Sequence, residues 1–452
     1  MDRPLIAIDG YNLALEQGTG VATYARGLSH RLQALGAEVG VLYGQPMSRG
    51  RDALIREATF FDPRTPLSRG WARSQDVIRV LTLLRRMTAL SVPLTDRVIR
   101  TALETRLPKA ERFWTVPDLF RAATLSFGLT KRFGRVVLPG GAALMHWTYP
   151  LPLRVQGTPN IYTIHDMVPL RLPYTTLDNK PRHLRMLRRI AREADHIVTV
   201  SESAKRDIVS LLDVPPERVT NTYQAVEVPD RLATSPEPMV RAELKGAFGL
   251  DWQDYFLFLG AIEPKKNVGR LIEAYLASGS ERPLVICGRQ AWNAHQELGL
   301  LYEDDRRTMQ PHGPLEGIQG LARRLRDRVM LINYVPFRLL VGLIRGARAM
   351  LFPSLYEGFG LPVLEAMQLG TPVMTSNTSS LPEVAGDAAL LVDPYDTRAM
   401  AEAIQKLDSD AELRAELAAR GPKQAAQFGA EPYAKRLREM YARLGIRLEG
   451  EG

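Results

Sequence analysis

The sequence predicts an α/β protein whose sheets are built from parallel strands. Apolar runs of strand length alternate along the chain with stretches of helical apolar spacing, which is the pattern of βαβ units. Glycine turns follow several of these runs, at the place where open α/β sheets bind ligands. The length of 452 residues indicates two domains.

The first domain is predicted to cover residues 1–228. It opens with a strand at 5–9, a glycine turn around Gly18 and Gly20, and a helix at 24–35. A helix is also predicted within 181–194. The further strands are predicted at 38–43, 144–147, 160–165 and 196–200.

A polar stretch that contains three prolines, residues 229–250, reads as a linker. The second domain is predicted at 251–431, and residues 432–452 are predicted to form a C-terminal helix and tail. The strands predicted in the second domain are 255–260, 283–287, 328–332, 349–353, 372–376 and 389–392.

The single cysteine, Cys287, excludes a disulfide framework and favours a reducing compartment. The first apolar run is too short for a signal peptide and is interrupted by Asp9. The sequence has no uncharged apolar run of transmembrane length. We therefore expect a cytoplasmic protein.

Positive charge is concentrated in one region. The whole chain has a net charge of +9, and the segment from Arg64 to Arg135 alone has fifteen basic and five acidic residues, a net of about +10. We interpret residues 64–135 as a basic helical insert in the first domain.

In this segment, Val77, Val80, Leu81 and Leu84 lie at helical spacing among arginines. The arginines are Arg73, Arg79, Arg85 and Arg86, and the aromatic residues are Trp71, Phe113, Trp114, Phe120 and Phe127. A basic amphipathic helix can lie on an anionic membrane surface. The other interpretation, a helical subdomain whose apolar stripe is core, has equal weight. Nucleic acid is disfavoured as a partner because no recognised binding motif accompanies the charge.

The most informative stretch begins at Glu357 and ends at Met367. It follows a predicted buried strand, passes through a turn with Gly358 and Gly360, and continues with helical spacing. The free amides at a helix N-terminus favour an anion, and glycines let a ligand approach the backbone. Carboxylates accept hydrogen bonds from hydroxyls. Phosphate on the amides together with hydroxyls on Glu357 and Glu365 describes a nucleotide sugar.

This block resembles the donor-site signature of retaining glycosyltransferases of family 4, which have the GT-B fold. Glu357 and Glu365 match the two glutamates of that family. The flanking segments 352–356, 370–373 and 381–386 are also typical of it. The resemblance implies two Rossmann-like domains that face a cleft, with a C-terminal helix that crosses back to the first domain. A solvated helix cap and a surface glutamate are the structural alternative, which the matching flanks disfavour.

Lys265 and Lys266 follow a predicted strand and the turn at Gly260, and they resemble the basic diphosphate motif of the family. Lys266 aligns with its principal lysine. Many relatives have an arginine where this chain has Ala261, so either Lys265 or Arg289 supplies the second cation. No Asp-x-Asp stands in a metal-binding context, and we expect these cations to neutralise the leaving diphosphate without a metal or other cofactor.

His165 and Asp166 end a predicted strand and resemble the acceptor-domain motif of the family, in which the histidine bonds a sugar hydroxyl. We expect Asp166 to orient the ring of His165, although a satisfied loop histidine is the alternative. Ser201 is expected to cap a helix that contains Asp207, which is a structural role.

Further donor contacts follow from the resemblance. The amides of Gly18 and Gly20 are expected at the diphosphate, Tyr334 and Val335 at the base, and Glu365 at the ribose hydroxyls. Glu357 and the amides of Phe359, Gly360 and Leu361 are expected to hold the sugar. The Gly-x-Gly pair and the Tyr334 loop are weak signals, and an ordinary loop is an equal alternative for the latter.

The sequence thus predicts a retaining, metal-independent hexosyltransferase. Its branch of the family resembles bacterial mannosyltransferases of surface-polysaccharide assembly, including lipopolysaccharide. We expect GDP-mannose as donor and a glycan or lipid-linked glycan as acceptor, at the inner face of the plasma membrane. The alternatives are a UDP- or dTDP-sugar donor, a GT-B epimerase or phosphorylase, and a non-catalytic sugar-nucleotide-binding partner subunit.

Overall fold

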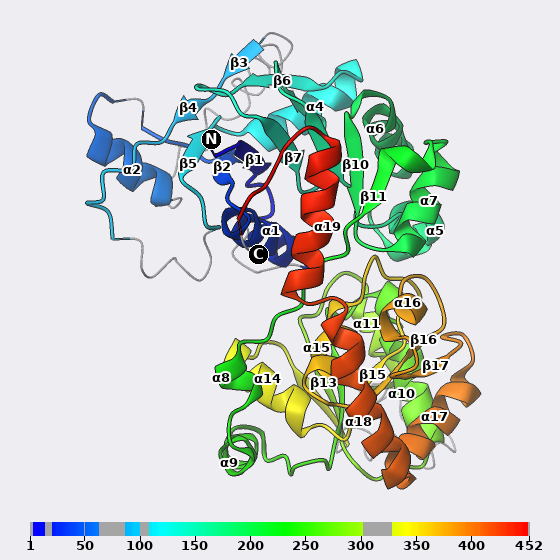
Figure 1. Ribbon diagram of the computed structural model, residues 1–452. Coiled ribbons are helices and arrows are strands. Elements are labelled where there is room, and N and C mark those ends of the chain that lie inside the picture. Colours follow the sequence, from blue (N-terminus) through cyan, green and yellow to red (C-terminus); the bar gives the residue numbers. More distant parts are fainter. Residues whose placement is uncertain are drawn as a thin grey trace, which may run out of the picture. The chain divides into compact units, whose positions relative to one another are not determined.

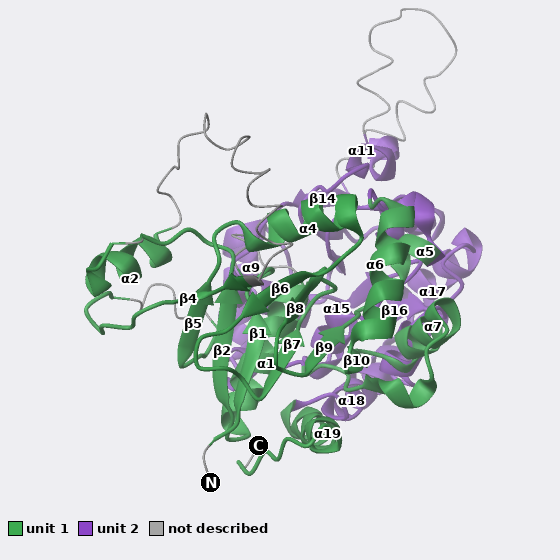
Figure 2. Cartoon of the chain, turned by 90° about the horizontal axis from the view of Figure 1, so that it is seen from above, with its two compact units in different colours: residues 1–170, 178–225, 430–452 green, residues 171–177, 226–429 purple. Residues whose placement is uncertain are grey.

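In the computed structural model of the chain, the described residues are 3–13, 20–48, 50–62, 86–99, 108–301 and 328–450. They form two compact units, which Figure 2 shows in different colours. Unit 1 consists of residues 1–170, 178–225 and 430–452. Unit 2 consists of residues 171–177 and 226–429.

The core of unit 1 is an eight-stranded sheet with the order β11-β10-β9-β7-β1-β2-β5-β4. All of its neighbouring strands are parallel except β4, which pairs antiparallel with β5. Its strands are β1 (Leu5–Asp9), β2 (Glu38–Tyr43), β4 (Leu90–Ser91), β5 (Arg112–Thr115), β7 (Leu144–Trp147), β9 (Asn160–Thr163), β10 (His196–Thr199) and β11 (Val219–Asn221). A second sheet, β3-β6-β8, is parallel and consists of β3 (Arg86–Thr88), β6 (Gly134–Val137) and β8 (Leu153–Val155).

The helices of unit 1 lie around these sheets (Figure 1). They are α1 (Gly20–Ala34), α2 (Ala53–Phe61), α4 (Leu119–Thr130), α5 (Val168–Arg171), α6 (Lys180–Glu193), α7 (Glu202–Leu212) and α19 (Ala430–Arg443). Short polar side chains cap the starts of α2 (Asp52), α6 (Asn179) and α7 (Ser201). Ser201 caps α7 as predicted, because its Oγ accepts a hydrogen bond from the amide of Ala204 at 3.0 Å.

The prediction of one helical insert over 64–135 needs correction in its described part. Strand β5 pairs with β2, so this part of the segment belongs to the main sheet. Trp114 and Phe127 are buried in the core of unit 1 and are not interfacial aromatics. A Cβ on Gly40 would lie 2.2 Å from the Trp114 ring, so only glycine fits beneath it. The predicted amphipathic stretch at 77–84, with Trp71, Arg79 and Arg85, lies outside the described residues.

Unit 2 contains a fully parallel six-stranded sheet with the order β14-β13-β12-β15-β16-β17. Its strands are β12 (Phe256–Leu259), β13 (Leu284–Cys287), β14 (Val329–Ile332), β15 (Ala349–Phe352), β16 (Val373–Ser376) and β17 (Leu390–Val392). Strands β13, β15 and β16 are buried along their whole length, as expected for strands covered on both faces.

The helices of unit 2 begin before its first strand, since α8 (Asp230–Ala233) and α9 (Glu237–Phe248) fill the range predicted as a linker. Pro236 and Pro238 stand at the start of α9, where proline suits a helix. The range 229–250 is therefore part of unit 2. Its other helices are α10 (Val268–Ala277), α11 (Ala294–Glu297), α14 (Phe337–Gly346), α15 (Leu361–Gln368), α16 (Leu381–Ala385), α17 (Thr397–Ser409) and α18 (Ala411–Ala426).

The last helix of the chain belongs to unit 1, although α18 directly before it belongs to unit 2. Helix α19 buries Tyr433, Leu437, Met440 and Tyr441. None of the helices in the described ranges combines the length and the apolar character that a bilayer crossing requires.

Candidate active site

Two glycines mark the carboxyl ends of the neighbouring strands β12 and β13. Gly260 and Gly288 have φ angles of 153° and 158°. A Cβ on Gly288 would lie 1.9 Å from the carbonyl oxygen of Gly260, so no other residue fits there. The two turns approach each other at the edge where parallel sheets bind ligands.

The segment after Gly260 forms a short 3-10 helix, η5 (Pro264–Lys266), which holds both predicted lysines. It is fixed by Asn267, whose Nδ2 donates to the carbonyl oxygens of Pro353 at 3.1 Å and of Pro394 at 2.7 Å. The amide of Leu355 donates to the carbonyl oxygen of Lys265 at 2.8 Å. The lysine turn and the loop after β15 are therefore joined through the backbone.

Lys266 and Glu357, both predicted catalytic residues, form a direct ion pair. Lys266 Nζ lies 2.6 Å from Glu357 Oε1, and the two side chains are 12% and 11% exposed. Lys266 Nζ also lies 4.8 Å from the centroid of the Phe352 ring, a cation–π geometry. The structure thus brings together two residues that the sequence placed in separate motifs.

The surroundings keep Glu357 ionised. Burial alone would raise its pKa, but the positive charges of Lys266 and Lys265 outweigh burial and hold the pKa of Glu357 below its usual value. Lys265 itself forms an ion pair with Glu263 at 3.4 Å. Each lysine of the turn therefore has a carboxylate partner.

The loop from Glu357 to Gly360 is braced by two serines that the sequence analysis did not single out. Ser379 Oγ accepts from the amide of Glu357 at 2.9 Å. Ser380 Oγ lies 3.0 Å from the carbonyl oxygen of Glu357 and 2.8 Å from that of Phe359, and donates to them. In the sequence, only their position just before a helix, α16, could have indicated that these serines hold a neighbouring loop.

Gly360 begins α15 in a left-handed conformation, with φ of 114°. A Cβ there would lie 2.9 Å from Leu381, so both conformation and space require glycine. Leu361 and Pro362 open the helix, and Phe359 is buried against Phe428 with ring centroids 5.7 Å apart. The backbone therefore turns at Gly360, as the predicted strand–turn–helix site requires.

Glu365 lies on α15 and is half-buried. Its carboxylate has neither a hydrogen-bond donor nor a cation partner among the described residues. Burial raises the pKa of Glu365 to about 7. A carboxylate in this state gains from any ligand that donates hydrogen bonds to it.

For the other residues predicted to contact the donor, the structure gives a place in the chain and an exposure. Arg289 is exposed and follows β13 directly after Gly288. Tyr334 is 82% exposed and Val335 is buried, just before α14. Gly20 is the first residue of α1, and Gly18 lies outside the described residues.

In unit 1, His165 lies two residues after the end of β9. Its Nε2 donates to the carbonyl oxygen of Thr148 at 2.9 Å, which fixes the tautomer of the neutral ring. The Tyr24 ring packs edge-to-face on it, with centroids 4.8 Å apart. Burial lowers the pKa of His165, so the neutral ring keeps Nδ1 as an acceptor.

Asp166 does not orient this ring, contrary to our expectation. Its Oδ1 accepts from the amide of Val168 at 3.0 Å and so supports the start of α5. The orienting acceptor is the Thr148 carbonyl, and Thr148 is in turn held by Asp9 at the end of β1. Asp9 Oδ2 accepts from the Thr148 amide and from its Oγ1 at 2.9 Å. Burial raises the pKa of Asp9 to about 6, although hydrogen bonds from Thr148 and Tyr11 act to lower it.

A buried chain of hydrogen bonds connects α19 with the Tyr24 side of His165. His146 Nδ1 lies 2.7 Å from the Tyr441 hydroxyl, and His146 Nε2 lies 2.8 Å from Thr163 Oγ1. Thr163 Oγ1 lies 3.0 Å from the Tyr24 hydroxyl. Burial lowers the pKa of His146 to about 3, so this histidine stays neutral and relays hydrogen bonds without charge.

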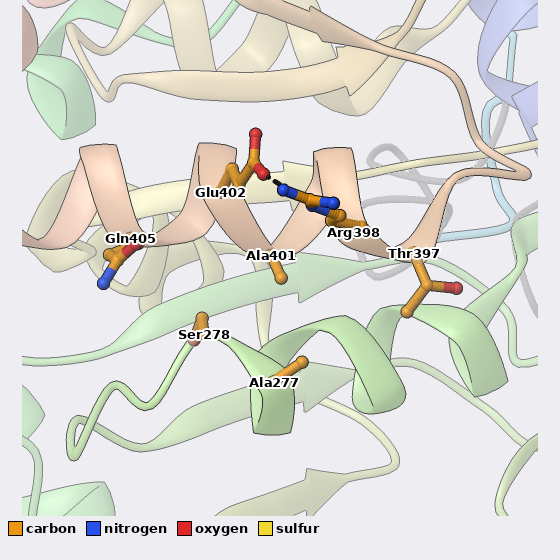
Figure 3. Close-up of a pocket in the computed structure, with 7 residues that line it drawn as sticks. All are labelled: Ala277, Ser278, Thr397, Arg398, Ala401, Glu402 and Gln405. Atoms are coloured by element: carbon orange, nitrogen blue, oxygen red, sulfur yellow. Dashed lines mark hydrogen bonds and ion pairs between the residues drawn. The ribbon is translucent and has the colours of Figure 1, made fainter.

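A hollow of about 360 Å³ lies between α10 and α17, but it contains none of the predicted site residues (Figure 3). Its charged groups, Arg398 and Glu402, are paired with each other at 3.0 Å on one helix. Within the described ranges, no group of three or more His, Cys, Asp or Glu side chains is arranged to hold a metal ion.

Comparison with known proteins assigns a family to both units. Residues 18–228 match Glycosyltransferase Family 4, and residues 241–424 match Glycosyl transferases group 1. The chain is 33% identical over 286 residues to O-antigen chain mannosyltransferase B of Escherichia coli, covering 62% of this chain and 69% of that protein. It is 28% identical over 298 residues to the serotype-specific mannosyltransferase WbdA of Escherichia coli, covering 62% of this chain but only 33% of WbdA.

The fold is similar to that of sucrose-phosphate synthase from Thermosynechococcus elongatus. The TM-score is 0.62 at 19% identity, and the match covers 98% of this chain and 99% of that one. This likeness and the two parallel sheets confirm the predicted GT-B fold. The chain belongs to glycosyltransferase family 4.

Proposed function

We propose that this glycosyltransferase moves mannose from GDP-mannose, with retention of configuration, to a growing surface polysaccharide or its lipid-linked precursor. The observation that carries the proposal is the Lys266–Glu357 pair beside the turn of Gly260. Glu365 on α15 supports it, because its carboxylate has no partner among the described residues. Two similar proteins are named as mannosyltransferases, one of them of the O-antigen chain, and they support mannose as the sugar.

In the proposed complex, Glu365 accepts hydrogen bonds from the ribose hydroxyls of the donor. Lys266 binds the diphosphate, with Lys265 as the second cation or Arg289 in its place. Glu357 and the amides of Phe359, Gly360 and Leu361 hold the sugar, and Gly18 and Gly20 approach the diphosphate. Tyr334 and Val335 contact the base. The half-buried Glu365 is suited to this role because bound hydroxyls replace the water that burial has removed.

The reaction breaks the bond between the anomeric carbon and the diphosphate oxygen and forms one to the acceptor oxygen on the same face. The proton of the acceptor hydroxyl goes to the departing diphosphate oxygen, so no protein nucleophile is required. Lys266 stabilises the negative charge that develops on this leaving group. His165 accepts a hydrogen bond from a sugar hydroxyl at Nδ1, because its Nε2–H is already used by Thr148.

We assign the electrostatic work of a divalent ion to the lysine turn, so the proposed reaction proceeds without metal. A cation held 2.6 Å from a carboxylate is positioned before the donor arrives. Preorganised charge of this kind lowers the cost of the transition state because little reorganisation remains.

The enzyme is proposed to work from the cytoplasm at the inner face of the plasma membrane. Arg79 and Arg85 of the predicted insert lie outside the described residues, and Arg86 lies in β3. Among the described residues, the basic surface that supports this proposal lies on α6. Arg185, Arg188 and Arg192 are exposed on one stripe of α6 and form no ion pair or hydrogen bond with a described residue. Arg182 donates to the carbonyl of Thr124 and so joins α6 to α4 (Figure 2). Leu129 of α4 is 74% exposed. Exposed cations on α6 and an exposed leucine on the joined helix α4 suit an anionic leaflet.

Thermal unfolding with a panel of nucleotide sugars tests the proposal. A bound donor raises the unfolding temperature, and saturation at a hundred times Kd stabilises by about 2.7 kcal/mol. We expect a shift with GDP-mannose, a smaller one with UDP-glucose, and a reduced shift with GDP-mannose for Glu365→Gln. Glu402→Gln, a glutamate of α17 outside the site, is the control. Transfer to a mannose oligosaccharide, followed by proton NMR of the new anomeric centre, then tests retention. Binding without transfer would instead favour a sugar-nucleotide-binding subunit.

A further inference from the structure

We propose that Tyr11, supported by Tyr149 and Phe120, is a stacking platform for a sugar ring of the acceptor glycan. The inference rests on the proposed function, because it names the place in unit 1 at which the acceptor is held. It concerns side chains that none of the donor-site or acceptor-domain motifs above includes.

The three rings form a compact cluster. Tyr11 stacks on Tyr149 with centroids 5.7 Å apart and an interplanar angle of 26°, and it meets Phe120 edge-on at 5.2 Å. Tyr149 and Phe120 pack against the core of unit 1, whereas Tyr11 is 39% exposed. The cluster therefore presents one partly free ring on a fixed base.

The backbone around the platform is fixed as well. The amide of Tyr11 donates to Asp9 Oδ1 at 3.2 Å. A Cβ on Gly10 would lie 2.5 Å from the Tyr43 ring, and a Cβ on Gly44 would lie 2.8 Å from Phe120. Because both positions are glycine, the Tyr43 and Phe120 rings pack directly on the main chain at these points. This packing fixes the backbone beside Tyr11 and the ring that Tyr11 contacts before any ligand binds.

The position of the platform connects it to His165. Asp9 binds the amide of Tyr11 with one carboxylate oxygen and Thr148 with the other. The carbonyl of the same Thr148 accepts from His165. Tyr149, the next residue, carries the ring beneath Tyr11. One buried carboxylate thus holds both the platform and the support of the candidate catalytic histidine.

The chemistry of the cluster favours a neutral sugar. One face of a pyranose ring consists mainly of C–H groups, which pack well on an aromatic face. Tyrosine supplies rigid amphipathic contact area at low entropy cost, with a hydroxyl for polar contacts. The carboxylate of Asp9 beneath the loop disfavours a phosphate at the same place.

The test compares Tyr11→Ala and Tyr11→Phe with wild type, using a linear mannotriose as acceptor and GDP-mannose as donor. We expect Tyr11→Ala to raise the KM for mannotriose about tenfold, because the substitution removes the ring on which the sugar stacks. The dissociation constant of GDP and the slow hydrolysis of the donor should stay at wild-type values. Tyr11→Phe keeps the ring and should change the KM by less than about threefold.

Tyr174→Ala is the matched control, since this tyrosine is 62% exposed and lies in unit 2. It should leave the KM for mannotriose unchanged. Direct titration of mannotriose into each variant, monitored by ligand-observed NMR without donor, separates the platform from the proposed reaction. Weaker binding to Tyr11→Ala alone supports the platform even if no transfer is found. Equal mannotriose binding by wild type and Tyr11→Ala, or no binding by either, would overturn it.

Discussion

Lys266 Nζ and Glu357 Oε1 lie 2.6 Å apart although 91 positions separate the two residues in the chain. The pair joins the lysine turn after β12 to the loop after β15. It gives the lysine a fixed position and keeps the glutamate ionised. A residue that serves both the reaction and the fold should show both effects when it is replaced.

Lys266→Ala should lower turnover by about two orders of magnitude, because a cation is lost from the developing negative charge. It should also lower the free energy of unfolding by about 3 kcal/mol, since a buried carboxylate is left unpaired. Steady-state kinetics and denaturant unfolding measure the two effects. The double variant Lys266→Ala, Glu357→Gln should recover stability but not turnover. Near-normal turnover in either variant would remove Lys266 from the reaction.

Glu365→Gln should weaken donor binding by about 1–3 kcal/mol with less effect on turnover at saturating donor. Because the pKa of Glu365 is about 7, the affinity for the donor should also depend on pH. Hydroxyl donors bind the ionised form, which predominates above this pKa. The affinity of the wild type for GDP-mannose should therefore be about tenfold weaker at pH 6 than at pH 8. Calorimetry across this range should show no such slope for Glu365→Gln, and a slope of the same size in the variant would contradict the assignment.

Chelators should leave sugar transfer intact. The lysine turn neutralises the departing diphosphate in our proposal, so an added divalent ion has no necessary role. Initial rates in EDTA should equal those in magnesium or manganese within about twofold. Activity that EDTA removes and either metal restores would show that the lysines are insufficient.

Tyr441→Phe should destabilise unit 1 by about 1–3 kcal/mol, because it removes the hydroxyl bonded to buried His146 Nδ1. Hydrogen exchange of β7 and β9 amides reports this locally, which matters because a chain of two units need not unfold in one step. Tyr174→Phe, at an exposed tyrosine, is the control and should change stability by less than about 0.5 kcal/mol. Unchanged protection of β7 in Tyr441→Phe would mean that the buried chain contributes little.

The protein should sediment with anionic liposomes at low salt and not with neutral ones. Replacing Arg185, Arg188 and Arg192 with glutamate should abolish this binding, since each cation near the leaflet is worth about 1 kcal/mol. The control variant replaces Arg241, Arg398 and Arg420, which changes the net charge equally on helices of unit 2. High salt should release the wild type. If both triple variants lose binding equally, net charge rather than α6 governs it.

Features encoded within a short stretch were predictable from the sequence. The Glu357–Met367 block shows its turn and helix start through residue order, and the structure places Gly360 at the start of α15. The two lysines after β12 were likewise visible because a strand and a glycine precede them. Local patterns of this kind need no knowledge of the fold.

Partners that fold together from distant positions were not predictable. The group that orients His165 is the backbone carbonyl of Thr148. Every residue has a backbone carbonyl, so the residue type does not show which one will bind the histidine. Asp9 looked like an interruption of a strand, because its partner Thr148 becomes evident only when β1 and β7 pair. Strand β5 was missed for a similar reason. The basic charge of its segment favoured a helical insert, but a count of arginines does not show that Trp114 lies in a strand that pairs with β2.

The Tyr441–His146 bond has a consequence for how the chain is made. Its two partners are 295 positions apart, and the whole of 226–429 is synthesised between them. On a ribosome, unit 2 therefore has its full sequence while the buried imidazole of unit 1 still lacks its phenol partner. Domains generally fold as units during synthesis. Unit 2 can therefore finish folding first, whereas unit 1 can finish only after α19 has been synthesised. A chain that ends shortly before residue 430 and has been released from the ribosome should carry a protease-resistant unit 2 and a unit 1 that is still open to cleavage.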